Sequence, residues 1–230
     1  MDKKKPARKM SNKGKKKNLQ KEINIIEGAL KVFGEKGFED TTIAAISKAA
    51  KISEPTLYEY FASKEEVLFA IPNLYTRREL ERIAKIVHYI HSPAEKIRAI
   101  IQAYLEFYEN NRLYTSVALL TLKGNRKFLK SQGYAVIKES TRHIVEVFTE
   151  GVNAGVFRED IDAYLVRNMV MGFIEHLTIQ WLLVGRPEKI SDYRDKIFDM
   201  VIRAIEKRPE KESFRLTISG HDLNIESEIK

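Results

Sequence analysis

Residues 52–66, ISEPTLYEYFASKEE, contain two signals that start a helix. Ser53 precedes Pro55. A serine hydroxyl can accept from the free N–H groups of a first helical turn, and proline fits there because its missing N–H would have no partner. Ser63 with Glu66 forms a capping box for a second helix. The stretch therefore predicts a short helix, a sharp stop and a longer helix that begins after Ser63.

The residues before this stretch predict a further short helix. In DTTIAAISKAA, residues 40–50, either Thr41 or Thr42 can be the N-cap, and the apolar residues recur at helical spacing. Two short helices joined by a brief turn are typical of a helix-turn-helix, in which the second helix lies in the major groove of DNA. A bundle of three helices without a DNA role has the same spacing, so the pattern alone leaves both interpretations open.

The rest of the chain is predicted to be all-α, because apolar residues recur every three or four positions and no run before residue 213 alternates for long. Pro72 falls inside the helix that follows Ser63 and is expected to kink it near Ala70. Residues 208–230 lose the helical period, so a frayed tail and a short strand both stay open. The expected helices cover roughly residues 19–34, 41–50, 54–61, 64–90, a segment from Pro93 onward, 114–124, 127–153, 161–184 and 188–206.

Basic residues concentrate at the N-terminus. The net charge is +8, and residues 1–21 alone hold ten Lys or Arg against one Asp. The other residues carry 30 basic and 31 acidic groups and are nearly neutral. Such an arm is attracted to polyanions, because neutralised phosphates release counterions, although a tail that only raises solubility has the same composition. We expect residues 1–18 to form a disordered basic arm.

The composition excludes several classes of protein. The chain has no cysteine, which excludes disulfides and thiolate chemistry and favours a cytoplasmic location. Polar residues interrupt the apolar run after the basic arm, so a secretory signal is not expected. The most apolar stretch contains Arg167, Glu175 and His176, which a membrane span would have to bury at a high free-energy cost. We therefore expect no membrane span.

A longer segment around the opening stretch carries a family resemblance. Residues 25–71 contain A-L-x-x-F-x-E-x-G-F, then T-T-I-x-x-I-x-x-A-A, then S-x-P-T-L-Y-x-Y-F-x-S-K-E-E. These motifs resemble the N-terminal signature of the TetR/AcrR transcriptional repressors. The resemblance implies a helix-turn-helix DNA-binding domain over residues 19–62, a helical ligand-binding and dimerisation domain over 63–207, and a C-terminal tail over 208–230.

The resemblance also implies DNA contacts for single residues. Thr42 is expected to donate to a phosphate, residues 53–56 to approach base edges or backbone, and Tyr58 and Lys64 to hold phosphates. A hydroxyl can bond a phosphate oxygen without carrying charge, whereas a lysine adds a positive charge. The expected DNA-binding residues are Thr42, Lys51, Ser53, Glu54, Pro55, Thr56, Tyr58, Tyr60 and Lys64. Leu57 and Phe61 are expected to pack in the core.

Two features depart from the family pattern. The turn position that is usually glycine is Lys51, so a lysine is expected to adopt left-handed backbone angles at a cost of roughly 1 kcal/mol. Glu54 and Glu59 place negative charge near DNA, and a carboxylate there can accept from the amino group of cytosine. We expect Glu54 to read a base and Glu59 to be solvated.

The second half of the chain is rich in large aromatic side chains, most of which must fill a core. The family resemblance implies an apolar ligand cavity there, and one or two of five candidates are expected to line it: Phe107, Tyr108, Phe173, His176 and Trp181. It also implies a homodimer through the last two long helices, whose apolar residues exceed what a single small bundle needs to bury: Leu182, Ile197, Phe198, Val201 and Ile205.

The sequence thus favours a ligand-responsive repressor that binds a palindromic operator as a dimer and is released by a small apolar effector. An architectural protein that coats DNA through its basic arm, without a ligand, is the alternative. An enzyme is disfavoured, because no catalytic constellation is evident. His88 and His91 are three positions apart, but Glu95 is the nearest acid, so solvation is favoured over metal binding. No cofactor or metal is expected.

Overall fold

The computed structural model describes residues 12–207, 212–219 and 222–229. Its α-helices are α1 (Asn12–Lys36), α2 (Ile43–Ala50), α3 (Glu54–Tyr58), α4 (Lys64–Tyr89), α5 (Pro93–Asn110), α6 (Arg112–Ser116), α7 (Gln132–Ser140), α8 (Arg142–Asn153), α9 (Ala163–Val184) and α10 (Arg194–Ile205). A π-helical segment, η1 (Val117–Leu122), follows α6, and 3-10 turns precede α7 (η2, Phe128–Lys130) and α10 (η3, Ile190–Tyr193). The strands are β1 (Glu212–Ser219) and β2 (Asp222–Ile229).

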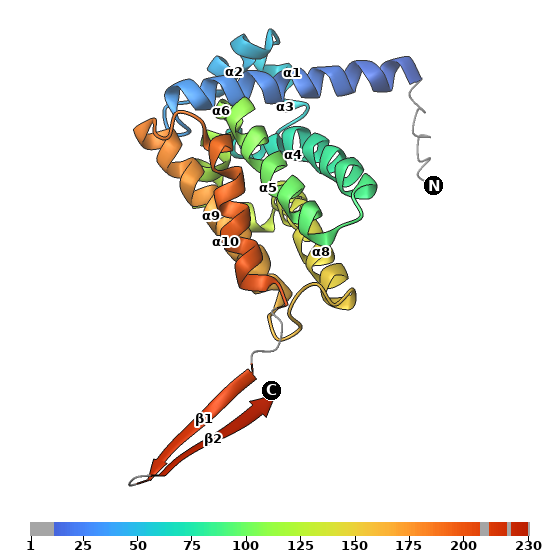
Figure 1. Cartoon of the computed structure of the whole chain (residues 1–230). Coiled ribbons are helices and arrows are strands. Elements are labelled where there is room, and N and C mark those ends of the chain that lie inside the picture. Colours follow the sequence, from blue (N-terminus) through green and yellow to red (C-terminus); the bar gives the residue numbers. More distant parts are fainter. Residues whose placement is uncertain (1–11, 208–211, 220–221, 230) are drawn as a thin grey trace, which may run out of the picture.

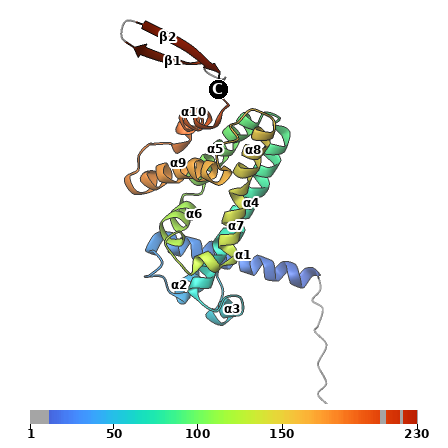
Figure 2. The same ribbon diagram turned by 90° about the horizontal axis from the view of Figure 1, so that it is seen from below.

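The helices form two connected parts. Helices α1, α2 and α3 lie together at one end of the molecule, and the β hairpin lies beyond the opposite end (Figures 1 and 2). Helix α4 leaves the first part and packs along α7 and α5, while α9 and α10 pack against α5 on the other side of the bundle. Helix α4 is therefore the element that joins the two parts.

One apolar core runs through both parts. It includes side chains that are completely buried in five helices: Ile25 of α1, Leu57 of α3, Ile71 of α4, Ile101 of α5 and Val201 of α10. Burying a side chain of this size contributes about 1.5–3 kcal/mol. The core is continuous because α1 contacts both α4 and α6.

Gly28 shows why the first part is so compact. A Cβ atom added there would lie 2.8 Å from the backbone nitrogen of Ala50 and 3.1 Å from the carbonyl carbon of Ala49. The backbones of α1 and α2 therefore touch at this position, and a side chain would force them apart.

The predicted helix starts are largely confirmed. The Ser63 hydroxyl accepts from the Glu66 N–H at 3.2 Å, and the Ser92 hydroxyl accepts from the Glu95 N–H at 3.4 Å. The Glu66 carboxylate reaches back to the N–H of Ala62 at 2.7 Å. Helix α4 continues through Pro72 as far as Tyr89. The predicted kink near Ala70 stays a prediction.

The boundary of the basic arm is wrong in part. We expected disorder over residues 1–18 and a helix from residue 19, but α1 begins at Asn12. Residues 1–11 lie outside the described residues. Once α1 is nucleated by its packed half, each further residue adds a hydrogen bond at little cost, and lysine is a good helix former. Helix propagation therefore extends into the basic segment.

The single helical period predicted over residues 127–153 is also wrong. The segment divides into η2, α7 and α8, with a break at Thr141. The Thr141 hydroxyl donates to the Lys138 carbonyl at 3.0 Å, and the Tyr104 hydroxyl donates to the Ser140 carbonyl at 2.8 Å. Because these hydroxyls compete for helix carbonyls, the chain can turn here, and α7 packs on α4 while α8 packs on α5 and α9.

The C-terminal segment forms a strand pair rather than a frayed tail. β1 and β2 pair antiparallel, with Glu212 opposite Ile229 and Ser219 opposite Asp222. Residues 208–211, 220–221 and 230 lie outside the described residues. Up to residue 207 the described chain is helical apart from its turns and one isolated bridge between Phe157 and Glu206, which confirms the predicted all-α class.

Candidate nucleic-acid interface and effector cavity

The start of α2 exposes a hydroxyl. Thr42 is the N-cap: its backbone is extended, and its Oγ1 accepts from the Ala45 N–H at 3.2 Å. Thr41 is buried, and its hydroxyl donates to the Gly37 carbonyl at 2.6 Å. Of the two candidate caps, only Thr42 therefore presents a free hydroxyl hydrogen on the surface, where it can donate to a phosphate.

The turn after α2 is formed as expected. Lys51 has φ 57° and ψ 44°, which is the left-handed conformation. Its N–H donates to the Lys48 carbonyl at 3.2 Å, and the Ile52 N–H donates to the Ser47 carbonyl at 3.0 Å. These bonds stabilise the turn despite the strain of a non-glycine residue. The Lys51 side chain is exposed next to the start of α3.

The start of α3 is an exposed, well-ordered helix N-terminus. Ser53 accepts from the Thr56 N–H at 3.3 Å, and the two hydroxyls share a hydrogen bond at 2.9 Å. Glu54 and Pro55 are exposed beside them. The residues expected to meet base edges therefore lie together on one surface.

The aromatic residues of this region divide as expected between core and surface. Leu57 is completely buried and Phe61 is 8% exposed, whereas Tyr58 is 54% exposed. Tyr60 is half-buried, and its hydroxyl donates to Oδ1 of Asn18 in α1 at 3.3 Å. The Tyr60 hydroxyl thus links α1 to the turn before α4, whereas the side chain of Tyr58 is exposed to solvent.

Lys64 occupies a different environment from the one its predicted role suggests. Its ammonium donates to the carbonyls of Phe38 at 2.9 Å, Glu39 at 3.0 Å and Thr41 at 3.1 Å, and it lies 4.6 Å from the centre of the Phe38 ring. An ammonium has three N–H donors, and all three are used. Lys64 therefore fixes the turn before α2, and a phosphate contact would require one of these bonds to break.

A small cavity lies inside the helical bundle. Its volume is about 30 Å³, which has room for one or two waters. Phe107 and Tyr108 line it, as the sequence analysis expected. The other lining residues are Thr76, Tyr104, Tyr114, Ala118, Leu119, Lys123, Ile137, Ser140 and Glu175.

The cavity wall is rich in hydroxyl groups. Thr76 and Tyr114 share a hydrogen bond at 2.5 Å, and the Tyr104 hydroxyl donates to the Ser140 carbonyl at 2.8 Å. Burial raises the pKa of Tyr114 to about 12. These contacts join residues far apart in the sequence, so neither spacing nor local pattern could have identified Thr76, Tyr114 or Ser140.

Tyr108 differs from the other two tyrosines. Its side chain is buried, and its hydroxyl forms no hydrogen bond with any group in the described part of the chain. Burial raises its pKa well above the ordinary value, and the negative charge of Glu175 adds to the rise. Tyr108 therefore keeps its proton and offers an unused O–H donor at the cavity.

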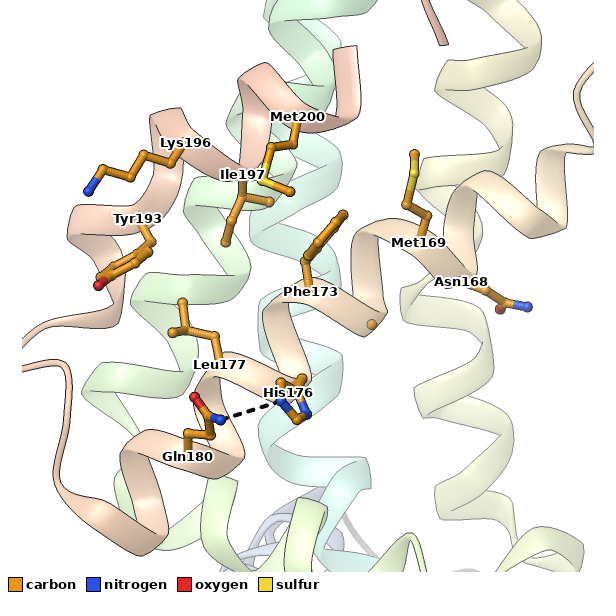
Figure 3. A pocket seen from close by; sticks show the side chains of 11 residues that line it. Asn168, Met169, Phe173, His176, Leu177, Gln180, Tyr193, Lys196, Ile197 and Met200 are labelled. Atoms are coloured by element: carbon orange, nitrogen blue, oxygen red, sulfur yellow. Dashed lines mark hydrogen bonds between the residues drawn. The ribbon is translucent and has the colours of Figure 1, made fainter. Parts of the chain in front are cut away.

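Phe173 and His176 do not line this cavity. They line an open apolar groove of about 600 Å³ between α9 and α10, to which Phe173 and Leu177 of α9 and Ile197 and Met200 of α10 contribute side chains (Figure 3). His176 is exposed and lies 3.5 Å from the Gln180 amide. These two candidates therefore lie on a different side of α9 from Glu175 and line a different space from Phe107 and Tyr108.

Trp181 lines neither space. It is 7% exposed, and the Arg112 guanidinium lies 4.2 Å from its ring. A cation over an indole face is a favourable contact that stabilises packing. Of the five candidates for a ligand pocket, Trp181 is the one that packs in the core in this structure.

The apolar residues expected at a dimer interface are mostly core. Ile197 and Phe198 are each 5% exposed, and Val201 and Ile205 are completely buried within the chain. The sequence pattern could not separate a helix face that packs on its own bundle from one that stays open. The large apolar residues that are exposed on α9 and α10 are Tyr164, Leu165, Leu183, Val184 and Met200.

Among the described residues, no group of three His, Asp or Glu side chains lies close enough to hold a metal ion. No helix of that same part of the chain is both long and apolar enough to cross a membrane.

Comparison with known proteins gives matches over most of the chain. A family model described as bacterial regulatory proteins of the tetR family matches residues 25–71, and one described as the C-terminal region of YsiA-like protein matches residues 77–204. The fatty acid metabolism regulator protein of Bacillus subtilis is 21% identical over 193 residues, covering 84% of this chain and 100% of that protein. The HTH-type transcriptional repressor KstR2 of Mycobacterium tuberculosis is 26% identical over 188 residues, covering 80% and 92%.

A solved structure shares the fold. The transcriptional regulator FadR from Bacillus subtilis, in complex with stearoyl-CoA, superposes with a TM-score of 0.74 and covers 78% of this chain and 97% of its own. The two sequences are 21% identical in this alignment. The similarity therefore concerns the arrangement of helices.

Proposed function

Because the chain belongs to the tetR family of bacterial regulatory proteins, we propose that it is a ligand-responsive transcriptional repressor that binds a palindromic operator as a homodimer. The observation that carries this proposal is the exposed start of α3, where Ser53, Glu54 and Thr56 form one capped surface beside Thr42. A helix of this width fits the major groove, where exposed hydroxyls and a carboxylate can meet base edges. Such a repressor acts in the cytoplasm and needs no catalytic activity.

The open groove between α9 and α10 supports the homodimer. Met169, Phe173, Leu177 and Met200 line it, and Met200 is 56% exposed in the single chain. An apolar groove of this kind is covered most simply by the same surface of a second copy, which is the symmetric arrangement of most dimers. Two recognition helices then face DNA together, and half-sites are expected about 34–36 Å apart or at a multiple of that distance.

The interior cavity supports control by a small molecule. Helix α4 carries Lys64, which fixes the turn before α2, and twelve residues later Thr76, which bonds Tyr114 in the cavity wall. A molecule larger than the cavity must move one of its walls. An effector that binds better to a conformer with α4 displaced shifts the population toward that conformer and weakens operator binding. The relative whose structure contains stearoyl-CoA supports an effector with an apolar part.

The test is binding of the purified protein to a DNA fragment from beside its own gene. We expect a shifted band that an unrelated fragment does not compete away, and loss of the shift in the Thr56→Ala/Glu54→Ala variant. The Glu59→Ala variant is the matched control, because Glu59 is exposed one turn further along. Equal binding to both fragments would contradict the proposal.

The same assay separates the repressor from a protein that coats DNA through its basic arm. Deleting residues 1–17 removes nine of the ten basic residues in the first 21. For a repressor, specificity persists and the salt dependence becomes shallower, because fewer phosphates are neutralised. For a coating protein, binding collapses.

A further inference from the structure

The hairpin of β1 and β2 has one apolar face and one polar face. Successive residues of a strand lie on opposite faces, and residues that are paired directly across two strands lie on the same face. The register pairs Leu216 with Ile225 on one face and Thr217 with Asn224 on the other. The first face holds six apolar residues together with Glu212 and Ser227, and the six are Phe214, Leu216, Ile218, Leu223, Ile225 and Ile229. Every residue of the second face is Ser, Thr, Asn, Asp, Glu or Arg.

No described helix packs along this hairpin. The two strands pair with each other beyond the end of α10, and neither of two views at right angles shows a helix beside them (Figures 1 and 2). A two-stranded hairpin by itself is only marginally stable in water, whereas packing of its apolar face or addition of strands stabilises it. Alternation of apolar and polar residues is typical of a sheet that is covered on one side. The hairpin therefore has the composition of a sheet whose second layer comes from elsewhere.

The hairpin is tethered close to the end of α10. The Arg158 N–H donates to the Ile205 carbonyl at 2.9 Å, and so fixes the last residue of α10 to the loop after α8. The Lys207 N–H donates to the Val156 carbonyl at 2.9 Å and extends this attachment. Glu212 follows Lys207 by five positions, which span at most about 18 Å when fully extended. The start of β1 therefore lies within this distance of a fixed point on the bundle.

The tether places the hairpin beside the proposed dimer interface. Met200 lines the groove between α9 and α10 and precedes Ile205 by five positions, which is about 7.5 Å along the helix. A dimer that reads a palindrome has a twofold axis that presents both helix-turn-helix domains to one side. Because the hairpin lies beyond the opposite end of the chain (Figures 1 and 2), the same axis brings both hairpins to the far side of the dimer.

We infer that the apolar face of the hairpin packs against the same face of the hairpin in a second copy of this chain, as a second dimerisation element beyond α9 and α10. This inference rests on the homodimer of the proposed function. Two hairpins packed in this way form a two-layer sheet with the apolar faces inside and the polar faces in water. Asp222, Glu226 and Glu228 belong to the polar face, so these carboxylates do not oppose one another across the contact. The hairpin lies outside both segments matched by the family models.

A pair of double variants tests the apolar face in the full chain. Leu216→Lys/Ile225→Glu places opposite charges at paired positions, which favours strand pairing while removing the centre of the apolar face. Since two apolar residues leave the interface, the dissociation constant of the dimer should rise at least about tenfold. The control Thr217→Lys/Asn224→Glu makes the same exchange at the next pair, on the polar face, and should stay within about twofold of the parent. Sedimentation velocity over a dilution series measures the constant.

Crosslinking locates the contact. The chain has no cysteine, so a single introduced cysteine reports on one position. Packed sheets lie about 10 Å apart, so a short bismaleimide should link two copies of the Leu216→Cys variant. Thr217→Cys, on the opposite face, is the matched control and should stay unlinked. Equal linking of both variants, or of neither, would contradict packing through the apolar face.

Two other occupants of the apolar face would overturn the inference. If the face packs on the helices of its own chain, Leu216→Lys/Ile225→Glu should lower the midpoint of thermal unfolding and leave the dimer dissociation constant unchanged. If the face binds a different protein, the variant should change neither quantity.

Failure of this inference is distinguishable from failure of the proposed function. If Leu216→Lys/Ile225→Glu dimerises like the parent and both bind the promoter fragment specifically, the hairpin contact is wrong and the repressor proposal stands. If the parent chain is monomeric at every concentration, the hairpin contact is again wrong, and the DNA assay decides the repressor proposal separately. If the parent does not bind DNA specifically, the proposed function fails whatever the sedimentation shows.

Discussion

The helix-turn-helix and the interior cavity hold their polar side chains in different ways. In the helix-turn-helix, Thr42, Ser53 and Ser63 each bond a backbone N–H three residues further along the chain. In the cavity, Thr76 bonds a residue 38 positions away, and Lys123 pairs with one 52 positions away. The first region is specified by its own short sequence, whereas the second exists only when the whole bundle is assembled.

This difference has a consequence for regulation. Local caps keep the DNA-contacting surface formed in any conformer of the bundle, while the cavity contacts change when helices shift. Lys64 is the exception, because its three bonds connect the start of α4 to the turn before α2 across 23 to 26 positions. It is the point at which a movement of α4 can reach the DNA-binding surface.

The largest effect is expected from Leu57→Ala. Leu57 is completely buried in α3 and belongs to the core shared by both parts. Removing such a side chain costs about 2–5 kcal/mol of unfolding free energy. Urea denaturation followed by circular dichroism should show one transition, shifted to lower urea, with loss of operator binding. Leu129→Ala, at a position 51% exposed, is the control and should change stability by no more than about 0.5 kcal/mol.

Two separate unfolding transitions in the urea denaturation curve would contradict the view that one core joins the two regions. They would mean that the helix-turn-helix unfolds by itself and that the continuous core does not couple it to the bundle.

The second largest effect is expected in the pH dependence of the unfolding free energy, and it concerns Tyr114 in the cavity wall. Burial raises the pKa of Tyr114 from 10.0 to about 12, so the folded state keeps a proton that the unfolded state loses above pH 10. The resulting stability is fully present below pH 10 and is lost as pH rises to about 12, by roughly 2–3 kcal/mol. Tyr114→Phe should flatten this part of the profile of unfolding free energy against pH.

The matched control for Tyr114 is Tyr89→Phe, at a position 80% exposed, which should leave the profile unchanged. Because other tyrosines also titrate in this range, the quantity to compare is the difference between each variant and the parent. An unchanged profile for Tyr114→Phe would show that this hydroxyl is not held in a desolvated cavity.

The difference between local caps and long-range cavity contacts explains which features could be predicted from the sequence. The caps at Thr42, Ser53 and Ser63 and the left-handed turn at Lys51 follow from neighbouring residues, and the structure confirms each of them. The cavity hydroxyls come from α4, α5, α6 and α7, whose relative placement no local pattern encodes. Aromatic residues in the ligand region of a family are natural candidates for a pocket, but the sequence could not show that Tyr108 and Phe173 line two different spaces.

The Lys64→Ala variant distinguishes a structural role of Lys64, which fixes the turn before α2, from a role in binding a phosphate. Removing the three bonds to backbone carbonyls should lower the unfolding free energy by about 1–2 kcal/mol without DNA, since the side chain is partly exposed and its bonds are screened. It should also weaken binding to all DNA sequences alike. The control is Lys48→Ala, an exposed lysine of α2. Unchanged stability together with a shallower salt dependence would assign Lys64 to phosphate alone.

The smallest effect is expected from Tyr58→Phe, which removes one hydroxyl from the DNA-facing surface. Tyr58 is 54% exposed, so stability should not change, while the loss of one hydrogen bond to phosphate should weaken DNA binding by about 0.5–1.5 kcal/mol. The loss should be equal for operator and unrelated DNA, because phosphate contacts carry no sequence information. Tyr60→Phe is the comparison: it removes the bond to Asn18 within the protein. If Tyr58→Phe altered sequence preference instead, Tyr58 would read a base, and the division between a positioning tyrosine and a base-reading Glu54 would be wrong.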